Sequence, residues 1–272
     1  MHSTTLTQPT LNQDLPDTQS LHDGRGLAIQ NAGISGLQLP ATLIDIDGSH
    51  TTGAAEYSIS VAVQPHQKGT HMSRLVEFAQ QTASTIYLED VTALMPRLLD
   101  LMQAESGTAE IRIPWFVERQ APRSQRRSQL NLEFCLRLVQ ENLQAPGRIT
   151  YRLRVPVTTL CPCSKAISAY GAHNQRSIVA VEIELYELHS IDILTGLIES
   201  QASCPVYTVL KREDEKHVTE QAYDNPKFAE DIVRDVTLSL IEHCKPKKLH
   251  VSTTNHESIH NHAAFAELHW PQ

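Results

Sequence analysis

The sequence predicts an α+β fold in which one order of elements, two strands followed by two helices and two strands, occurs twice. Segments of alternating apolar and polar residues predict half-buried strands, because successive side chains of a strand point to opposite faces. Other segments repeat apolar residues at intervals of three and four, as on one face of a helix. Half-buried strands are typical of antiparallel sheets with one covered face. The chain of 272 residues, 40% of them hydrophobic, is long enough to bury such a core.

We divide the chain into an arm and two units. Residues 1–38 are polar and lack a sustained period, so we expect an N-terminal arm that is mobile or draped over the fold. In the first unit, residues 39–144, strands are expected at 39–48, 56–64, 111–117 and 130–138, with helices between 72 and 104. Pro96 inside the helical stretch implies a kink or an earlier stop, because proline lacks the backbone N–H.

The second unit, residues 145–272, follows the turn signal Pro146-Gly147. Strands are expected at 149–157, 179–185, 248–254 and 262–269, and helices at 190–202 and 225–243. We expect Asp224 or Asn225 to cap the last helix, with Pro226 in its first turn.

Charge and composition narrow the class of protein. A net charge of −8 argues against a nucleic-acid-coating protein, although a local basic pocket can still bind an anionic small molecule. The sequence has neither the run of roughly 18 to 20 apolar residues that crosses a bilayer nor an N-terminal secretory signal. Five cysteines without an export signal indicate thiols in a reducing cytoplasm.

Cys161 and Cys163 flank one proline after a predicted strand, and His173 follows. A disulfide across one residue is strained and thioredoxin-like motifs have two intervening residues, so a redox pair is disfavoured. Two buried structural cysteines are one alternative. The other is a metal site, because thiolate and imidazole suit Zn²⁺ and neighbouring divalent metals, and Gly171 permits a sharp reversal between them. Further ligands must then come from elsewhere.

Residues 256–260 spell the zinc-protease pattern H-E-x-x-H. In a protease this pattern needs a helix, so that both histidines face one metal. Here the preceding residues alternate like a strand, and no clear third ligand follows. A turn with exposed histidines is therefore the simpler interpretation of the five letters alone.

Two charged clusters offer cations. Residues 210–231 place Lys211 and its basic neighbours beside Glu213, Asp214 and Glu215, although a solvated loop before a helix is the default interpretation. Residues 68–74, which include His71 and Arg74, lead into a predicted helix. A helix N-terminus favours anions, but many helices begin with such residues and bind nothing.

Four motifs together are similar to the prokaryotic GTP cyclohydrolase IB family. They are KGTHMSR (68–74), TTLCPCSKAISAYGAHNQRS (158–177), KREDEKHVTEQAYDNPKF (211–228) and HESIHNHAAFA (256–266). The resemblance runs from about residue 39 to the end, and LPDTQ (15–19) is a less distinctive part of it. It implies two tandem tunnelling-fold (ββααββ) modules with antiparallel sheets and helices on one face. It also implies a homotetramer whose strands form barrels and whose active sites lie at subunit interfaces.

The resemblance further implies a hydrolase of cyclic amidine C–N bonds. The implied reaction converts GTP and water into 7,8-dihydroneopterin triphosphate and formate, the first step towards folate. The family's metal positions correspond to Cys161, His173, Glu215 and His260, which would hold one divalent ion, Zn²⁺, Mn²⁺ or Fe²⁺. Such an ion generates hydroxide near neutral pH.

The remaining implied roles concern the substrate. His173 and His260 are candidates for proton transfer, and Glu257 corresponds to the carboxylate that anchors the purine, which leaves His256 incidental. For the triphosphate we nominate five basic residues: His71, Arg74, Lys165, Arg176 and Lys211. Cys163 is expected to pack or to tune the neighbouring thiolate.

Two alternatives stay open at this point. A related tunnelling-fold enzyme, the 7-deazaguanine nitrile reductase, uses a catalytic cysteine and NADPH, but the histidines and carboxylates here resemble a metal set. The second alternative is a non-catalytic module. In it, Cys161 and His173 only hold a loop together around a metal ion.

Overall fold

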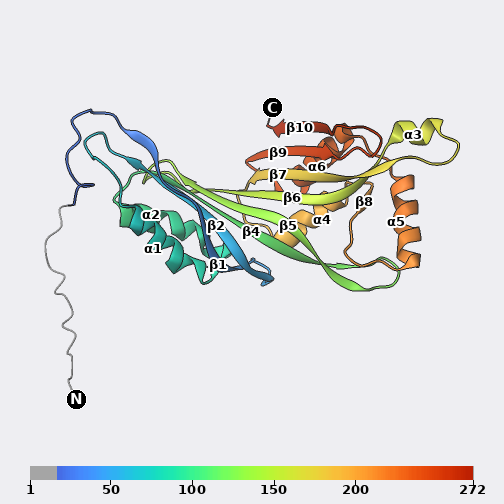
Figure 1. Ribbon diagram of the computed structural model, residues 1–272, viewed down its shortest axis with the longest axis horizontal. Coiled ribbons are helices and arrows are strands. Elements are labelled where there is room, and N and C mark those ends of the chain that lie inside the picture. The colour runs from blue at the N-terminus through green and yellow to red at the C-terminus, as the bar shows by residue number, and fades with distance from the viewer. Residues whose placement is uncertain (1–16, 272) are drawn as a thin grey trace, which may run out of the picture.

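The computed structural model describes residues 17–271, and its main feature is one ten-stranded sheet that extends along the long axis of the molecule (Figure 1). The long strands are β1 (Ile29–Ile44), β2 (His50–Val63), β4 (Gly107–Gln120), β5 (Arg127–Gln140), β6 (Arg148–Leu160), β7 (Asn174–Glu184), β9 (Lys248–Asn255) and β10 (Ala264–Trp270). The short strands are β3 (Ile86–Tyr87) and β8 (Cys204–Pro205). The order is β10-β9-β7-β6-β5-β4-β2-β1-β3, with β8 paired to β6. All pairs except β1–β3 are antiparallel.

Helices pack on one side of this sheet. α1 (Met72–Ala83) and α2 (Leu94–Met102) lie against β1, β2, β4 and β5. α4 (Ile191–Glu199) and α6 (Ala229–Cys244) lie against β6, β9 and β10. The short α3 (Pro162–Ile167) and α5 (Arg212–Asp224) stand at the end of the molecule opposite α1 and α2 (Figure 1). The predicted α+β fold, with a large antiparallel sheet and helices on one face, is confirmed.

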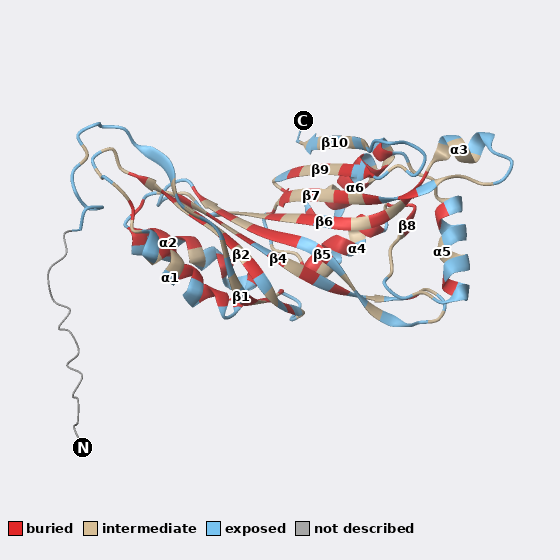
Figure 2. Ribbon diagram, viewed as in Figure 1, coloured by how far each residue is buried: buried red, intermediate tan, exposed pale blue. Residues whose placement is uncertain are grey.

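Alternating burial explains why the strand segments form this sheet. Along β6, Tyr151, Leu153, Val155 and Val157 are buried, and the residues between them are partly or fully exposed. Figure 2 shows the same banding along the neighbouring strands. Each such side chain stabilises the fold by about 1.5–3 kcal/mol relative to leaving it in water.

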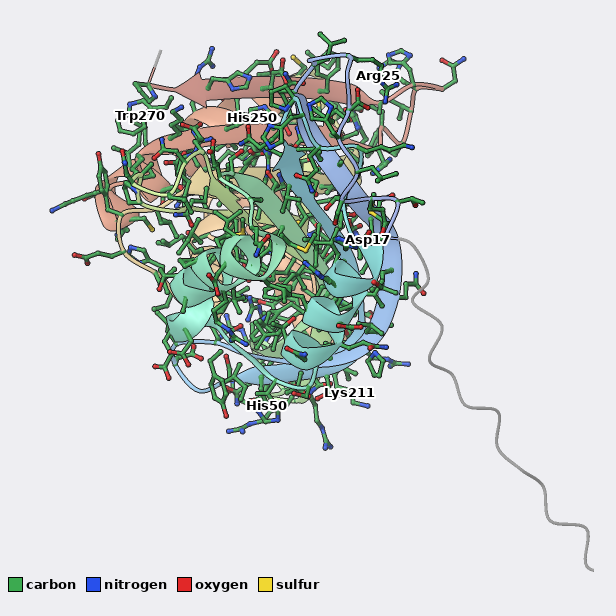
Figure 3. All side chains as sticks on the ribbon, turned by 90° about the vertical axis from the view of Figure 1, so that its left-hand side faces the viewer. Asp17, Arg25, His50, Lys211, His250 and Trp270 are labelled. Carbon is green, nitrogen blue, oxygen red and sulfur yellow. The ribbon has the colours of Figure 1, made fainter. Side chains whose placement is uncertain are left out.

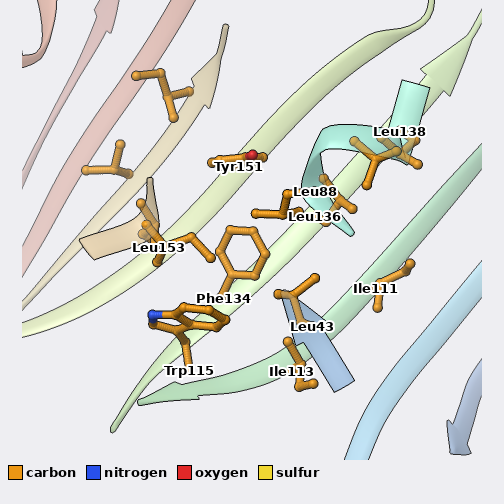
Figure 4. Close-up of a cluster of buried hydrophobic side chains, with 14 of the residues drawn as sticks. Leu43, Leu88, Ile111, Ile113, Trp115, Phe134, Leu136, Leu138, Tyr151 and Leu153 are labelled. Atoms are coloured by element: carbon orange, nitrogen blue, oxygen red, sulfur yellow. The ribbon is translucent and has the colours of Figure 1, made fainter. Parts of the chain in front are cut away.

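One hydrophobic core joins the two predicted units (Figure 4). The ring of Phe134 on β5 meets Tyr151 on β6 edge-on at a centroid distance of 5.2 Å, and Trp115 on β4 lies 6.5 Å from Phe134. In each half of the chain, two long strands precede the main helices and two follow them, with the short α3 between β6 and β7 and the two-residue strands β3 and β8 among the helices. The division into modules at residues 144 and 145, and the barrel-forming oligomer, stay predictions.

Polar contacts also connect the β1–β2 turn to the start of α4. The Asp45 carboxylate accepts hydrogen bonds from the N–H groups of Ile191 (2.7 Å) and Ile46 (2.8 Å), and Ser190 Oγ donates to Asp47 (2.6 Å). Burial raises the pKa of Asp45 to about 6, although its hydrogen bonds act in the opposite direction. The junction therefore contains a buried carboxyl group, that of Asp45, whose pKa lies in a mildly acidic range.

The sheet takes in part of the predicted arm. β1 begins at Ile29 rather than near residue 39, so residues 29–38 belong to the sheet. Most side chains in this part are exposed, which removes the alternation that marks a half-buried strand. Pairing with β2, for example Leu37 with Tyr57, holds its backbone instead.

The preceding residues 17–23 are draped along the loop before α1. Hydrogen bonds run from Gly69 N–H to Gln19 O (3.1 Å) and from Asp23 N–H to His66 O (2.8 Å). Residues 1–16, which include the first two letters of LPDTQ, lie outside the described residues.

The helical stretch at 72–104 is interrupted. α1 ends at Ala83, and α2 begins at Leu94 after a 3₁₀ turn, η1 (Leu88–Ala93). Pro96 lies in the first turn of α2, where its missing N–H removes no helical hydrogen bond. Pro96 therefore neither stops nor kinks the helix that contains it, which continues to Met102, so the expected early stop is wrong.

The charged cluster before the last helix is itself a helix, α5, so its default interpretation as a loop is wrong. Asp224 ends α5 and Asn225 follows it, and α6 begins only at Ala229, so the predicted cap and the first-turn position of Pro226 are wrong. The Asp231 carboxylate accepts a hydrogen bond from the Phe228 N–H (2.9 Å), which gives this backbone donor at the start of α6 a partner.

No helix within residues 17–271 combines the length and apolar character needed to cross a membrane.

Candidate functional site

The segment between β6 and β7 brings Cys161 next to His173. Cys161 caps α3, and its Sγ accepts a hydrogen bond from Ser164 N–H (3.4 Å). Gly171 has a φ of +118°, so the chain reverses there as expected. After the reversal, Cys161 N–H donates a hydrogen bond to His173 O (3.1 Å), and His173 N–H donates one to Ser164 Oγ (3.2 Å). Thiol and imidazole therefore occupy the two sides of one tight loop.

A buried polar network orients the His173 ring. Gln175 Oε1 lies 2.9 Å from His173 Nδ1, and Gln175 Nε2 donates to Thr159 Oγ1 (3.0 Å), which in turn lies 2.8 Å from Ser177 Oγ. An amide oxygen only accepts hydrogen bonds, so this contact places the imidazole proton on Nδ1. His173 Nε2 then carries a free lone pair, as a metal ligand or a base requires.

Glu257 joins the same place from the loop after β9. His256 N–H donates to Arg176 O (2.9 Å), which ties this loop to β7. Glu257 Oε2 lies 3.9 Å from His173 Nδ1, and the Glu257 side chain is 11% exposed. The loop is not helical, in agreement with the interpretation of H-E-x-x-H as a turn. Within one chain, His173 is thus a neighbour of both Cys161 and Glu257, although the ligand atoms of these three residues do not all lie within 4.8 Å of one another.

The other two predicted metal ligands do not complete this group within one chain. Glu215 is exposed on α5, and His260 is exposed with its ring stacked 5.1 Å from His262. Within residues 17–271, no three of Cys161, His173, Glu215 and His260 bring their ligand atoms within 4.8 Å of one another. Cys163 is exposed on α3, so the expectation that it packs is wrong.

Three of the residues predicted to bind the triphosphate lie at the end of the sheet that carries α3 and α5. Arg176 is exposed on β7, and Lys211 is exposed directly before α5. Lys165 of α3 donates from Nζ to Tyr223 O and lies 4.4 Å from the centre of the Tyr223 ring. Lys165 therefore connects α3 to the last turn of α5.

Asp214, which the sequence placed only within a charged cluster, holds α5 in position. It is fully buried, and its carboxylate accepts hydrogen bonds from Lys211 N–H (2.8 Å), Arg123 N–H (2.8 Å) and Ser124 N–H (2.9 Å). Burial opposes its ionisation, but these bonds and that of Ser124 Oγ outweigh burial and lower the pKa of Asp214 below its usual range. The turn between β4 and β5 is thereby fastened to the helix that carries Glu215.

His71 and Arg74, the remaining phosphate candidates, lie at the other end of the molecule. They line an open hollow of about 410 Å³ at the start of α1, and its other lining residues are Ser20, His22, Gln64, His66, Gln67, Met102 and Gln103. His71 Nε2 is 3.5 Å from the Asp17 carboxylate. Three histidines and an arginine make this hollow a candidate anion site.

The length of β4 measures the separation of the two ends. The hollow touches Gln103, just before β4, whereas the turn after β4 is bonded to α5 through Asp214. The 14 residues of β4 span roughly 45 Å at the rise of a strand. One chain therefore does not bring all ten predicted site residues together.

Comparisons with known proteins identify relatives over nearly the whole chain. Residues 15–266 match the family described as type I GTP cyclohydrolase folE2. GTP cyclohydrolase FolE2 1 of Dechloromonas aromatica (strain RCB) is 44% identical over 255 residues, 94% of this chain and 96% of the relative. GTP cyclohydrolase FolE2 of Nitrosococcus oceani is 40% identical over 260 residues, 96% of this chain and 97% of the relative.

Among solved structures, a urate oxidase from Bacillus sp. TB-90 is similar with a TM-score of 0.44 and 9% identity, over 89% of this chain and 99% of that chain. A TM-score of this size is too low to support a conclusion about fold or function.

Proposed function

This chain belongs to the type I GTP cyclohydrolase folE2 family, and we propose that its catalytic centre is built around Cys161, His173 and Glu257. The observation that carries this proposal is that His173 lies beside both partners at the loop between β6 and β7: its backbone oxygen accepts Cys161 N–H, and its Nδ1 is 3.9 Å from Glu257 Oε2. The residues come from two of the motifs that resemble the family, and the network through Gln175 orients one of them.

The chain is a GTP cyclohydrolase of folate and pterin biosynthesis, which converts GTP and water into 7,8-dihydroneopterin triphosphate and formate. We assign the reaction to hydrolysis of cyclic amidine C–N bonds, since the imidazole ring of guanine is opened. All five cysteines are free thiols, which supports a cytoplasmic location.

The donor atoms suit a divalent metal. Cys161 is a partly exposed free thiol whose Sγ accepts the Ser164 N–H, and His173 Nε2 is left free by the contact at Nδ1. A soft thiolate and an imidazole are ligands for Zn²⁺ or Fe²⁺, and carboxylate ligands extend the range to Mn²⁺. Cys161 and His173 would hold the ion, with Glu215 and His260 as further ligands. A bound ion supplies a water whose pKa is lowered towards neutrality.

The chain's own residues handle the purine and the protons. Glu257 accepts hydrogen bonds from the guanine amino and ring N–H groups, which orients the imidazole ring of the substrate towards the thiolate and imidazole. An imidazole transfers protons near neutral pH, so of His173 and His260 the one whose ring nitrogen does not hold the ion is the candidate for proton transfer. Gln175 keeps the His173 proton on Nδ1 throughout.

We further propose that the active site forms between copies of the chain. Four negative charges on GTP require several cations, and this chain places Lys165, Arg176 and Lys211 at one end and His71 and Arg74 at the other. Since these ends are roughly 45 Å apart, a second copy would supply the hollow beside α1. This arrangement requires a homo-oligomer, for which we propose a homotetramer, with GTP bound at the subunit interface.

Incubation of the metal-free protein with GTP and one divalent metal at a time tests the proposal. Formate is measured directly, and the pterin is measured as fluorescent neopterin after oxidation and dephosphorylation, with bound metal quantified in the same samples. We expect product only in samples that retain metal. Full turnover in metal-free protein would contradict the metal-dependent centre, and no product with Zn²⁺, Mn²⁺ or Fe²⁺ would contradict the activity.

A further inference from the structure

A histidine–glutamate–histidine group lies on the β9–β10 hairpin, apart from the proposed catalytic centre. His250 of β9 stands directly opposite His269 of β10 in the antiparallel register. Glu267 precedes His269 by two positions, so all three side chains project from the same face of the hairpin. Opposed side chains on neighbouring strands begin only about 5 Å apart at their Cβ atoms. The register alone therefore holds these residues together.

The geometry brings one possible ligand atom of each residue into a single small volume. The two imidazole rings are parallel, with centroids 4.0 Å apart and an interplanar angle of 4°. His250 Nε2 is 3.4 Å from Glu267 Oε2. One donor atom from each of the three residues lies within 4.8 Å of the other two, and no other such group exists within residues 17–271.

His250 Nε2 is also unsatisfied. This nitrogen is buried and has no hydrogen-bond partner within the described part of the chain, because the nearby Glu267 carboxylate is poorly aligned for a hydrogen bond. A buried polar atom without a partner is unfavourable. A cation that accepts the lone pair of this nitrogen would satisfy it.

The surroundings favour a positive charge. The hairpin borders a hollow of about 420 Å³ whose lining includes Glu182 and Glu184 of β7 together with His250 and His269, and Lys248 is the one lysine or arginine in that lining. Glu182 pairs across the strands with His250, and it also accepts a hydrogen bond from Arg152 Nε (2.8 Å). The local carboxylates thus exceed the local cations.

We propose that His250, Glu267 and His269 form a second divalent-cation site, which binds Zn²⁺-like ions through two imidazoles and a carboxylate. Such mixed nitrogen and oxygen ligands suit Zn²⁺, and a water completes the set. Because β10 is an edge strand, the ion clamps that edge onto β9.

The site is independent of the proposed catalytic centre. His250 lies five residues along β9 from Asn255, about 16 Å before the loop that carries Glu257. In a view along the molecule, His250 and Trp270 lie on the opposite side from Lys211 (Figure 3). The inference therefore holds or fails separately from the proposed function.

Zn²⁺ titration of the metal-free, full-length protein tests the site. We expect wild type to bind one more equivalent per chain than His269→Ala, which removes an exposed ligand from the edge strand. His250→Gln should weaken the same equivalent by more than about tenfold, because losing even an outer partner of a metal ligand has that effect. His50→Ala, an exposed histidine at the start of β2, should bind as wild type does.

Co²⁺ distinguishes the two centres by absorption. A site containing Cys161 gives an intense thiolate charge-transfer band in the near ultraviolet, whereas the His250 site contributes only weak visible bands. Loss of the weak bands alone in His269→Ala, with GTP turnover unchanged, supports the proposal. Equal Zn²⁺ stoichiometry and affinity in wild type, His269→Ala and His250→Gln would overturn it and leave a metal-free His–Glu ion pair. Loss of the charge-transfer band in His269→Ala would also overturn it.

Discussion

The two ends of the sheet carry different chemistry. At the α3 end, an imidazole oriented by the buried network of Gln175 and Thr159 lies beside a largely buried carboxylate, and a cysteine is bonded to the same histidine through the backbone. At the α1 end, His71 and Arg74 line an open hollow with two further histidines and no cysteine, and the Asp17 carboxylate lies 3.5 Å from His71 Nε2. The first end suits bond-breaking, and the second suits anion binding. This difference between the two ends is the basis of our proposal that a second copy of the chain completes the site.

The largest expected effect comes from the α3 end. Cys161→Ala should reduce kcat for GTP by more than about 100-fold, because loss of a direct metal ligand exceeds the 10–100-fold effect of losing an outer partner. The matched control is Cys163→Ala, which removes an exposed thiol on the same helix and should leave kcat near wild type. Steady-state GTP assays and gel filtration check both. Unfolding of Cys161→Ala would support a structural staple instead.

Gln175→Leu tests whether the buried network orients the imidazole. Removal of the acceptor for His173 Nδ1 should reduce kcat or metal affinity by roughly 10–100-fold. A shifted pH–rate profile is expected, which a purely structural defect would not produce, since the ring loses the contact that selects its tautomer. Gln175→Glu keeps an acceptor at this position and should restore much of the activity. Equal loss in both variants would contradict the orienting role.

Arg74→Ala tests the α1 end. We expect KM for GTP to rise by about 10- to 100-fold with a smaller change in kcat, because a charge-assisted hydrogen bond contributes about 1.5–3 kcal/mol. Arg97→Ala removes an exposed arginine of α2 outside the hollow and is the control. Unchanged KM in Arg74→Ala would remove this end from the substrate site.

The junction between the two halves affects the pH dependence of folding stability and should leave GTP turnover least changed. The folded-state pKa of Asp45, about 6, lies above its ordinary value of 3.8, so its neutral form is the one that folding favours. Its stabilising effect is complete below about pH 4 and is lost as the pH rises through 6. This costs up to roughly 3 kcal/mol in unfolding free energy.

Urea unfolding at pH 4.5, 5.5 and 7 measures this effect. The stability advantage of wild type over Asp45→Asn should shrink as the pH rises across this range. The control is Asp47→Asn, because the pKa of Asp47 is lowered and its titration falls below the range. A constant difference between wild type and Asp45→Asn would contradict the assignment.

Much of the fold was predictable because most strands are half buried. The alternation in β6, with Tyr151, Leu153 and Val155 buried, marks the strand directly. The start of β1 at Ile29 was not predictable in this way, since both faces of that part are largely exposed. The α5 helix was missed because its mean hydropathy is low and only Asp214 and Ala222 are buried.

The candidate site was predictable in its residue types and only partly in its geometry. Gly171 marked the reversal that joins Cys161 to His173, since a φ of +118° suits glycine. Gln175 and Asp214 were missed, because hydrogen bonds across strands and loops leave no periodic pattern. The distance from Arg74 to Cys161 depends on how the strands are ordered, which no local motif encodes.

Subunit complementation tests the central claim most directly. Cys161→Ala and Arg74→Ala each damage one end of the chain, so each homo-oligomer should be impaired in GTP turnover. When the two variants are co-expressed and purified as mixed oligomers, some interfaces combine an intact α3 end with an intact α1 end. At GTP concentrations well below the wild-type KM, we predict that turnover rises well above that of either variant alone, to about a quarter of wild type if the chains mix at random. Mixed oligomers no more active than the better variant would contradict a site shared between copies.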